Sequence, residues 1–199
     1  NGCTFISCHD WCEVVLQRFP SEYLSDADLL RGEFSLHRGT FQPRLKRLGD
    51  ILVSAFILII ASPLLLVSAL MIKLEDGGPI FYSQIRNGLG GFPYTIHKLR
   101  SMRIDAEQSG AQWVKRSDSR ITKVGSFLRR TRLDELPQLW CVFAGSMSLI
   151  GPRPERPEFD QELEHHIPHY RLRYCVRPGL SGWAQVNYPY GASVEDAAN

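Results

Sequence analysis

The stretch "ILVSAFILIIASPLLLVSALMI" (51–72) contains no charged residue, and it decides how the chain is built. Lys46, Arg47 and Asp50 precede it, and Lys73 follows it. As one helix at ~1.5 Å per residue it reaches about 33 Å, which is enough to cross the hydrocarbon core of a bilayer. So long an uncharged run in a chain of 199 residues predicts contact with membrane lipid rather than burial in a soluble core.

Ser62 and Pro63 interrupt this run near its middle. Pro63 offers no N–H to the carbonyl of Ile59 and its ring crowds that carbonyl, so a kink is expected there. The Ser62 hydroxyl is available to satisfy backbone groups that the proline frees. Basic residues flank both ends of the run, so charge gives no direction of insertion. Two readings stay open: a re-entrant helix that returns to the same membrane face, and a kinked helix that spans the bilayer.

Two segments after this run are rich in aromatic and β-branched residues, "PIFYSQI" (79–85) and "FPYTIHKLR" (92–100). The loop between them contains Asn-Gly, and this pattern predicts a β-hairpin. Helical patterns follow at about 121–145 and at 157–167, and Trp140 is expected in the core of the first. The predicted fold class is α+β, mainly helical with a small antiparallel β-hairpin. Its expected parts are a lead-in (1–45), a membrane helix (46–74) and a folded domain outside the lipid (75–199).

The middle of the chain is basic, with ten Lys or Arg residues against three Asp or Glu between Lys98 and Arg132. Such a balance suits phosphates, anionic lipid or nucleic acid. Aromatic residues are sparse in this cluster and a membrane run lies beside it, which argues against nucleic acid. Lys98 and Arg100 alternate to the same face of the second predicted strand, so both are candidate phosphate contacts.

The segment "RRTRLDELPQLW" (129–140) places two adjacent carboxylates, Asp134 and Glu135, behind Arg129 and Arg130. One reading is structural: Asp134 caps a helix and Pro137 lies in its first turn, where its missing N–H does no harm. The other reading is chemical. A carboxylate nucleophile and a metal ligand would face a phosphate that arginines hold. The two readings are compatible.

Six blocks then occur in a familiar order. They are "KRLGDILVSAFILIIASPLLL" (46–66), "GPIFYSQIRNG" (78–88), "IHKLRSM" (96–102), "DSRITKVGSFLRRTRLDELPQLW" (118–140), "SLIGPRPE" (148–155) and "RPGLSGWAQVN" (177–187). Over about residues 45–190 the chain resembles the bacterial sugar transferases, which are monotopic polyprenyl-phosphate phosphoglycosyltransferases. The resemblance implies a re-entrant helix broken at Ser62-Pro63. It also implies the C-terminal catalytic part of a longer member, with the family's last segment largely missing.

The resemblance implies a reaction as well. A sugar 1-phosphate passes from a UDP-sugar, expected to be UDP-glucose or UDP-galactose, to undecaprenyl phosphate, and UMP leaves. Asp134 matches the family's covalent nucleophile and Glu135 its Mg²⁺-binding partner, while Arg129 and Arg130 are expected to contact phosphate. Arg153 lies in "GPRP" (151–154), the family's uridine-side motif. The expected location is the bacterial inner membrane, with catalysis on the cytoplasmic face. Whether the chain forms a homo-oligomer is left open.

Two positions depart from the family pattern, which commonly has Asn at Cys141 and Asp at Ser146. Cys141 is expected to be a packing change, and the loss of an acid at Ser146 to alter a local hydrogen bond. Two other functions remain as alternatives. One is a membrane-associated scaffold or binding protein of the same fold without turnover. The other is a phosphohydrolase whose acceptor is water.

Overall fold

The computed structural model describes residues 41–107, 110, 118–182 and 185–186. Most of the expected lead-in lies outside the described residues. The helices and strands, in chain order, are α3 (Phe41–Asp76), β1 (Phe81–Asn87), η3 (Leu89–Gly91), β2 (Pro93–Leu99), α4 (Lys123–Thr131), η4 (Leu133–Gln138), α5 (Leu139–Ala144), β3 (Ser148–Ile150), α6 (Pro157–His166), η5 (Tyr170–Cys175) and β4 (Gly179–Ser181). The described part of the chain is mostly helical with a small antiparallel sheet, as predicted.

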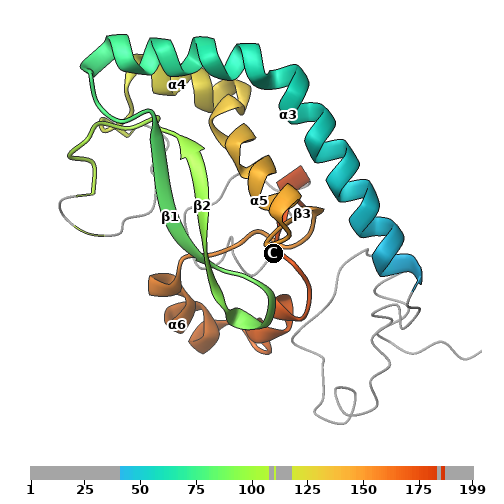
Figure 1. Cartoon of the computed structure of the whole chain (residues 1–199). Coiled ribbons are helices and arrows are strands. Elements are labelled where there is room, and N and C mark those ends of the chain that lie inside the picture. Colours follow the sequence, from blue (N-terminus) through green and yellow to red (C-terminus); the bar gives the residue numbers. More distant parts are fainter. Residues whose placement is uncertain (1–40, 108–109, 111–117, 183–184, 187–199) are drawn as a thin grey trace, which may run out of the picture.

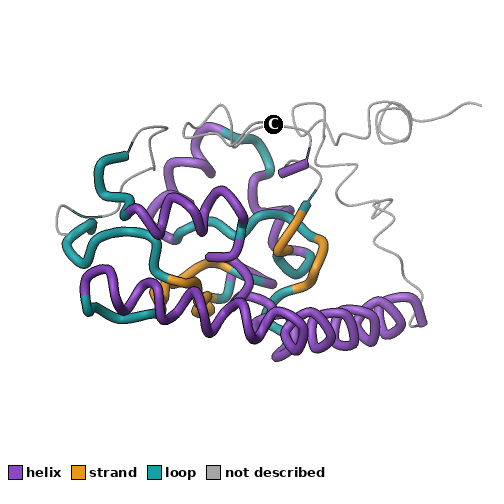
Figure 2. Tube along the Cα trace, turned by 90° about the horizontal axis from the view of Figure 1, so that it is seen from above, coloured by secondary structure: helices purple, strands orange, loops and turns teal. Residues whose placement is uncertain are grey.

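The long helix α3 lies along one side of the molecule (Figures 1 and 2). Its buried positions include Asp50, Ser54, Ser68 and Ile72, which recur at helical spacing and face the rest of the protein. Large apolar side chains on its other faces are exposed, among them Phe56 (64 %), Ile59 (73 %) and Leu66 (72 %). A helix this apolar and this exposed is long enough to cross a membrane.

Both ends of α3 are attached to the same body. Near its start, Asp50 accepts hydrogen bonds from the Ser148 hydroxyl (2.9 Å) and the Leu149 N–H (3.3 Å). Near its end, Ile72 packs in a buried cluster with Leu99 and Leu128. The last residue, Asp76, pairs with Arg100, which follows β2. The two halves of α3 therefore rest on one folded unit.

Pro63 lies inside α3, and Figure 1 shows that the helix changes direction part-way along its length. The Ser62 hydroxyl donates a hydrogen bond of 2.8 Å to the carbonyl of Ile59. That carbonyl is the one which Pro63 leaves without its helical N–H partner. The serine therefore satisfies the group that the proline frees, as the sequence suggests.

The hairpin forms as predicted, with β1 and β2 antiparallel from Phe81 opposite Leu99 to Asn87 opposite Pro93. In the connection between them, Gly90 and Gly91 adopt positive φ values of 68° and 77°, which glycine reaches without steric cost. Alternate β1 residues, Phe81 and Ile85, are exposed. The intervening side chains are less exposed and face the rest of the domain.

The helical region 121–145 is broken, contrary to the expectation of a helix that starts at Asp134. The helix α4 ends at Thr131, Arg132 takes a left-handed conformation (φ 60°), and the 3₁₀-helix η4 follows. Asp134 is thus inside η4 and caps nothing. A continuous α-helix would need an N–H from Pro137 and would press its ring against the Leu133 carbonyl. The chain re-forms an α-helix only in α5, beyond the proline.

A second sheet was not predicted. Strands β3 and β4 pair in parallel, with Ser148 opposite Gly179 and Ile150 opposite Ser181. Each strand has three residues, too few for a periodic pattern to identify. A side chain at Gly179 would meet the backbone nitrogen of Gly151 at 2.1 Å, so only glycine permits this close approach.

The expectation that Trp140 lies in the core is wrong. Its side chain is 59 % exposed and stacks on Phe143 at 5.7 Å between ring centroids. The break at Arg132 sets the rotation of α5, so that Leu139, Cys141 and Val142 are the buried residues of that helix. Cys141 packs with Ile96 and Met147, as expected of a packing change. The Ser146 hydroxyl donates to the Cys141 carbonyl at 3.2 Å.

Candidate active site

The two carboxylates of η4 lie against the second strand of the hairpin. Glu135 pairs with Lys98 of β2, at 2.8 Å from Oε1 to Nζ. Its other oxygen lies 3.5 Å from a guanidinium nitrogen of Arg132, the residue at the break between α4 and η4. The left-handed turn at Arg132 thus places its side chain beside Glu135, and the packing of η4 on β2 supplies the lysine.

Glu135 is held in its charged form. Burial acts to raise the pKa of its carboxyl, but Lys98, Arg153 and Arg132 outweigh burial and lower the pKa to about 2. The nearby cations favour the carboxylate because an opposite charge within a few ångströms stabilises the ionised state. Glu135 is therefore a fixed negative charge surrounded by three positive ones.

Asp134 has a different environment. Its side chain is only 7 % exposed, and among the described residues Oδ1 has no hydrogen-bond partner. Burial raises the pKa of this carboxyl above its ordinary value, and the charge of Glu135 raises it further. Lys98 and Arg129 act in the opposite direction. A buried carboxylate oxygen without a donor is costly, so its presence here calls for a chemical explanation.

Arg129 is placed by the segment that follows β2. Its Nε donates to the hydroxyl of Ser101 at 2.8 Å, and Ser101 is itself buried. The start of α4 packs closely on the same backbone, because a side chain at Gly125 would meet the Ser101 carbonyl oxygen at 2.0 Å. The arginine is thereby fixed near Asp134, and its charge acts on the pKa of that residue.

Arg153 reaches the acid pair from the loop between β3 and α6. Together with Lys98 and Glu135 it lines an open recess of about 250 Å³. The full lining is Arg86, Ile96, Lys98, Glu135, Gln138, Arg153, Pro154, Gly179, Leu180 and Gln185.

Two candidate residues lie apart from this cluster. Arg100 is buried and pairs with Asp76 at the end of α3, where it fastens the membrane helix to the hairpin. Arg130 is exposed in the last turn of α4. None of the contacts found in the described part of the chain joins either residue to the acid pair.

Sequence reasoning missed several residues of the recess, and Arg86 and Gln185 are two of the polar ones. Arg86 lies on the inner face of β1, the same face as Gln84. Its guanidinium donates a hydrogen bond of 3.0 Å to the Pro154 carbonyl. Gln185 donates to the Leu180 carbonyl at 3.3 Å, which leaves its buried Oε1 without a partner among the described residues. Both residues lie in sequence blocks that the chain shares with the family, "GPIFYSQIRNG" and "RPGLSGWAQVN". Membership of such a block is the one feature of the sequence that could have identified them as site residues.

The donors present fit a magnesium ion that is shared with a substrate. Within the described ranges, no group of three or more His, Cys, Asp or Glu side chains is placed to hold a metal. Magnesium is commonly bound by one or two carboxylates together with phosphate oxygens. The unpartnered oxygen of Asp134 and the ionised Glu135 are donors of this kind. The site therefore suits an ion completed by a diphosphate rather than a cage made by the protein alone.

An acid pair surrounded by cations therefore lies close to a long helix whose apolar side chains are exposed, a combination that suits a phosphate-bearing ligand at a lipid surface. The sequence profile of the family described as Bacterial sugar transferase matches residues 41–198. The chain belongs to this family.

Its relatives carry related names. The UDP-N-acetylgalactosamine-undecaprenyl-phosphate N-acetylgalactosaminephosphotransferase of Aeromonas hydrophila is 47 % identical over 76 % of this chain and 36 % of its own length. The UDP-glucose:undecaprenyl-phosphate glucose-1-phosphate transferase of Caulobacter vibrioides is 46 % identical over 71 % of this chain and 53 % of its own. A protein of the same name from Escherichia coli is 43 % identical over 72 % of this chain and 31 % of its own. The chain thus spans about a third to a half of these relatives.

Proposed function

We propose that this chain is the catalytic part of a transferase that moves a sugar 1-phosphate from a UDP-sugar to undecaprenyl phosphate and releases UMP. The observation that carries the proposal is the buried, unpartnered oxygen of Asp134 beside the cation-ringed Glu135. The names of the relatives support the reaction class. Those names include both glucose and N-acetylgalactosamine, so the donor panel contains these two sugars as well as galactose.

The first step is attack by a carboxylate oxygen of Asp134 on the phosphorus that bears the sugar. A bond forms between this oxygen and phosphorus, the bond to the bridging oxygen breaks, and UMP departs with that oxygen. Arg129 would stabilise charge on the phosphoryl oxygens, and its effect on the pKa of Asp134 supports this role. Arg153 and Lys98 hold the remaining negative charge of the donor from the recess.

The second step restores the enzyme. A phosphate oxygen of undecaprenyl phosphate attacks the phosphosugar on Asp134, the bond between Asp134 and phosphorus breaks, and the product is undecaprenyl diphosphate sugar. Glu135 remains ionised throughout because three cations hold its pKa low. Mg²⁺ bound by Glu135 and the donor phosphates would reduce the repulsion between the anionic donor and the carboxylates.

We further propose that α3 is re-entrant and that the catalytic domain lies on the cytoplasmic face of the inner membrane, where nucleotide sugars are found. The attachment of both ends of α3 to one folded unit supports this topology. If α3 crossed the bilayer, the folded unit that holds both of its ends would have to extend through the lipid as well. The bend in Figure 1 and the exposed Trp140 on α5 are consistent with a helix that dips and returns.

Cysteine labelling tests the topology. Leu45 and Leu74 are exposed at 57 % and 76 % and lie near opposite ends of α3. Leu45→Cys and Leu74→Cys, each compared with the parent protein, are treated with a membrane-impermeant maleimide in spheroplasts and in inverted vesicles. Both positions should react only in inverted vesicles. Reaction of the two positions from opposite sides would establish a spanning helix.

The reaction is tested by UMP release from UDP-glucose, UDP-N-acetylgalactosamine and UDP-galactose, with Mg²⁺, with and without undecaprenyl phosphate. Steady turnover should require undecaprenyl phosphate and be lost in Asp134→Asn. Release that ignores the acceptor would indicate hydrolysis. Silence with every donor, in detergent-stable protein that includes any upstream part, would favour a scaffold.

A further inference from the structure

The loop that carries Arg153 is held by a donor at each of four successive carbonyls. Pro152 and Pro154 have no N–H, so the backbone on both sides of Arg153 is restrained chiefly through its carbonyl oxygens. The four bonds are Gly179 N–H to Pro152 O (2.8 Å), Arg173 Nη2 to Arg153 O (2.6 Å), Arg86 Nη1 to Pro154 O (3.0 Å) and Asn87 N–H to Glu155 O (3.1 Å). Such a loop presents the Arg153 side chain from a fixed peptide.

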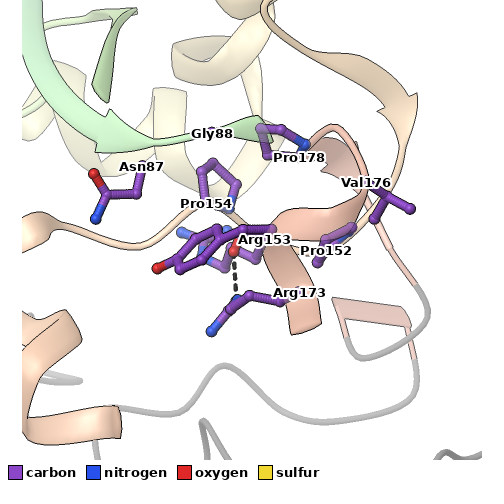
Figure 3. A pocket seen from close by; sticks show the side chains of 9 residues that line it. Asn87, Gly88, Pro152, Arg153, Pro154, Arg173, Val176 and Pro178 are labelled. Atoms are coloured by element: carbon purple, nitrogen blue, oxygen red, sulfur yellow. Dashed lines mark hydrogen bonds between the residues drawn. The ribbon is translucent and has the colours of Figure 1, made fainter. Parts of the chain in front are cut away.

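Among these four donors, Arg173 acts on the peptide of Arg153 itself. It reaches the loop from η5, and Figure 3 shows the bond from its guanidinium to the Arg153 carbonyl. The guanidinium also lies over the ring of Tyr170, 4.6 Å from the centroid. Stacking fixes the plane of the guanidinium, so the direction of the hydrogen bond is set before any ligand arrives.

The support behind Arg173 is buried. The hydroxyls of Tyr170 and Tyr174 both donate to Asp160, at 3.2 and 2.5 Å. Asp160 also accepts from the side-chain amide of Asn87, whose backbone N–H holds the carbonyl of Glu155. These contacts start at the Arg153 carbonyl and run through Arg173, the ring of Tyr170 and Asp160 to Asn87. They return to the same loop at the Glu155 carbonyl, so the loop is held from both ends of one network.

Arg173 makes its hydrogen bond to a neutral carbonyl oxygen. None of the carboxylates in the described part of the chain lies within pairing distance of it. A neutral donor would be sufficient to hold a carbonyl, so a guanidinium in this position adds positive charge beside the loop that carries Arg153. This choice of residue agrees with a loop built to meet a phosphate-bearing ligand.

We propose that Arg173 is a positioning residue: it fixes the peptide of Arg153 so that the Arg153 guanidinium faces Glu135 and the recess, and it thereby sets the affinity for the nucleotide diphosphate part of the donor. Arg173 acts through Arg153 and does not touch the donor. The inference rests on the proposed function only in taking Arg153 as a donor contact.

The test is a double-mutant cycle on UDP binding, measured calorimetrically with Mg²⁺ on the full chain in detergent. Arg173→Met keeps the apolar length and removes the donor, and it should weaken UDP binding about tenfold, the value of one charge-assisted hydrogen bond. In an Arg153→Ala background the same change should have no further effect, because nothing is left to position. Arg173→Lys, which keeps the charge and a donor, should recover part of the loss.

Arg171→Met is the matched control. Arg171 lies in the same 3₁₀-helix, is exposed, and pairs with Glu164 at 3.2 Å, so its loss should leave UDP binding unchanged. Unchanged binding in Arg173→Met, with Arg153→Ala weakened, would overturn the positioning role alone. A full tenfold loss that persists in the Arg153→Ala background would also overturn it. If Arg153→Ala itself binds UDP normally, both the positioning role and the proposed contact of Arg153 with the donor fail.

Discussion

Asp134 and Asp160 are equally buried, at 7 % exposure each, yet the protein treats them differently. Asp160, on α6, accepts hydrogen bonds from two tyrosine hydroxyls and an asparagine amide. Asp134, on η4, keeps one oxygen without a donor among the described residues and has a second carboxylate as its neighbour. The carboxylate of Asp160 therefore has donors for its charge, whereas Oδ1 of Asp134 has none among the described residues.

Under the proposed function, this difference separates a structural carboxylate, Asp160, from a nucleophilic one, Asp134. An unsatisfied buried polar group costs ~1–3 kcal/mol, and more when it is charged. A fold keeps such a group only where another requirement outweighs the cost, and active sites are where these exceptions collect. Asp160 connects α6, η5 and the end of β1, whereas Oδ1 of Asp134 has no hydrogen-bond partner in the described part of the chain.

The largest effect is expected for Asp134→Asn. Transfer should fall by at least about 10³-fold, because an amide cannot form the phosphosugar intermediate. The free energy of unfolding should not fall, since the change removes a charge whose burial and whose neighbour Glu135 both oppose it. UMP release and thermal unfolding of the same preparation measure the two quantities. Normal transfer by Asp134→Asn, or a clear fall in its free energy of unfolding, would mean that Asp134 does not differ from Asp160 in the way proposed.

The reverse pattern is expected for Asp160→Asn. The amide keeps one acceptor but brings an NH₂ group into a cluster of donors, so the free energy of unfolding should fall by about 2–3 kcal/mol. Transfer per folded molecule should fall far less than in Asp134→Asn. Denaturant unfolding gives the stability change. Glu164→Gln, on the same helix but 37 % exposed and paired with Arg171, is the control and should change stability by less than about 0.5 kcal/mol.

Glu135 is the intermediate case, since it is partly buried and is paired with Lys98 and Arg132. Its pKa is lowered to about 2, so its contribution to stability is present above the ordinary pKa of 4.5 and is lost as pH falls toward 2. Lys98→Met removes a cation that lowers this pKa, so the pKa should rise and the dependence of stability on pH in that window should become smaller. Unfolding followed by circular dichroism between pH 2 and 5 measures it. An unchanged slope would mean that Arg132 and Arg153 hold the charge without Lys98.

The strongly patterned elements could be predicted from the sequence, and the aperiodic ones could not. The long uncharged run predicted α3, because few other structures bury or expose so many consecutive apolar residues. Two segments rich in β-branched and aromatic residues around Asn-Gly predicted the hairpin, because Asn-Gly favours a tight turn. Strands of three residues carry no period, so β3 and β4 were missed. The break at Arg132 depends on a left-handed residue that is not glycine, for which residue type gives no signal.

The candidate site follows the same division. Asp134, Glu135 and Arg129 are adjacent in one segment, so they could be identified together. Lys98 was foreseen as a phosphate contact but not as the partner of Glu135, since that pair joins residues far apart in sequence. The role of Arg173 in holding the Arg153 loop depends on tertiary contacts alone.

The most direct measurement of the central claim is covalent labelling of the protein by a UDP-sugar carrying ³²P on the phosphate next to the sugar, with Mg²⁺ and without undecaprenyl phosphate. After denaturation the parent protein should retain label, Asp134→Asn should retain none, and addition of undecaprenyl phosphate before denaturation should move the label into lipid. A parent protein that turns over its donor without ever retaining label, or an Asp134→Asn protein that retains it, would contradict the assignment of Asp134 as the nucleophile.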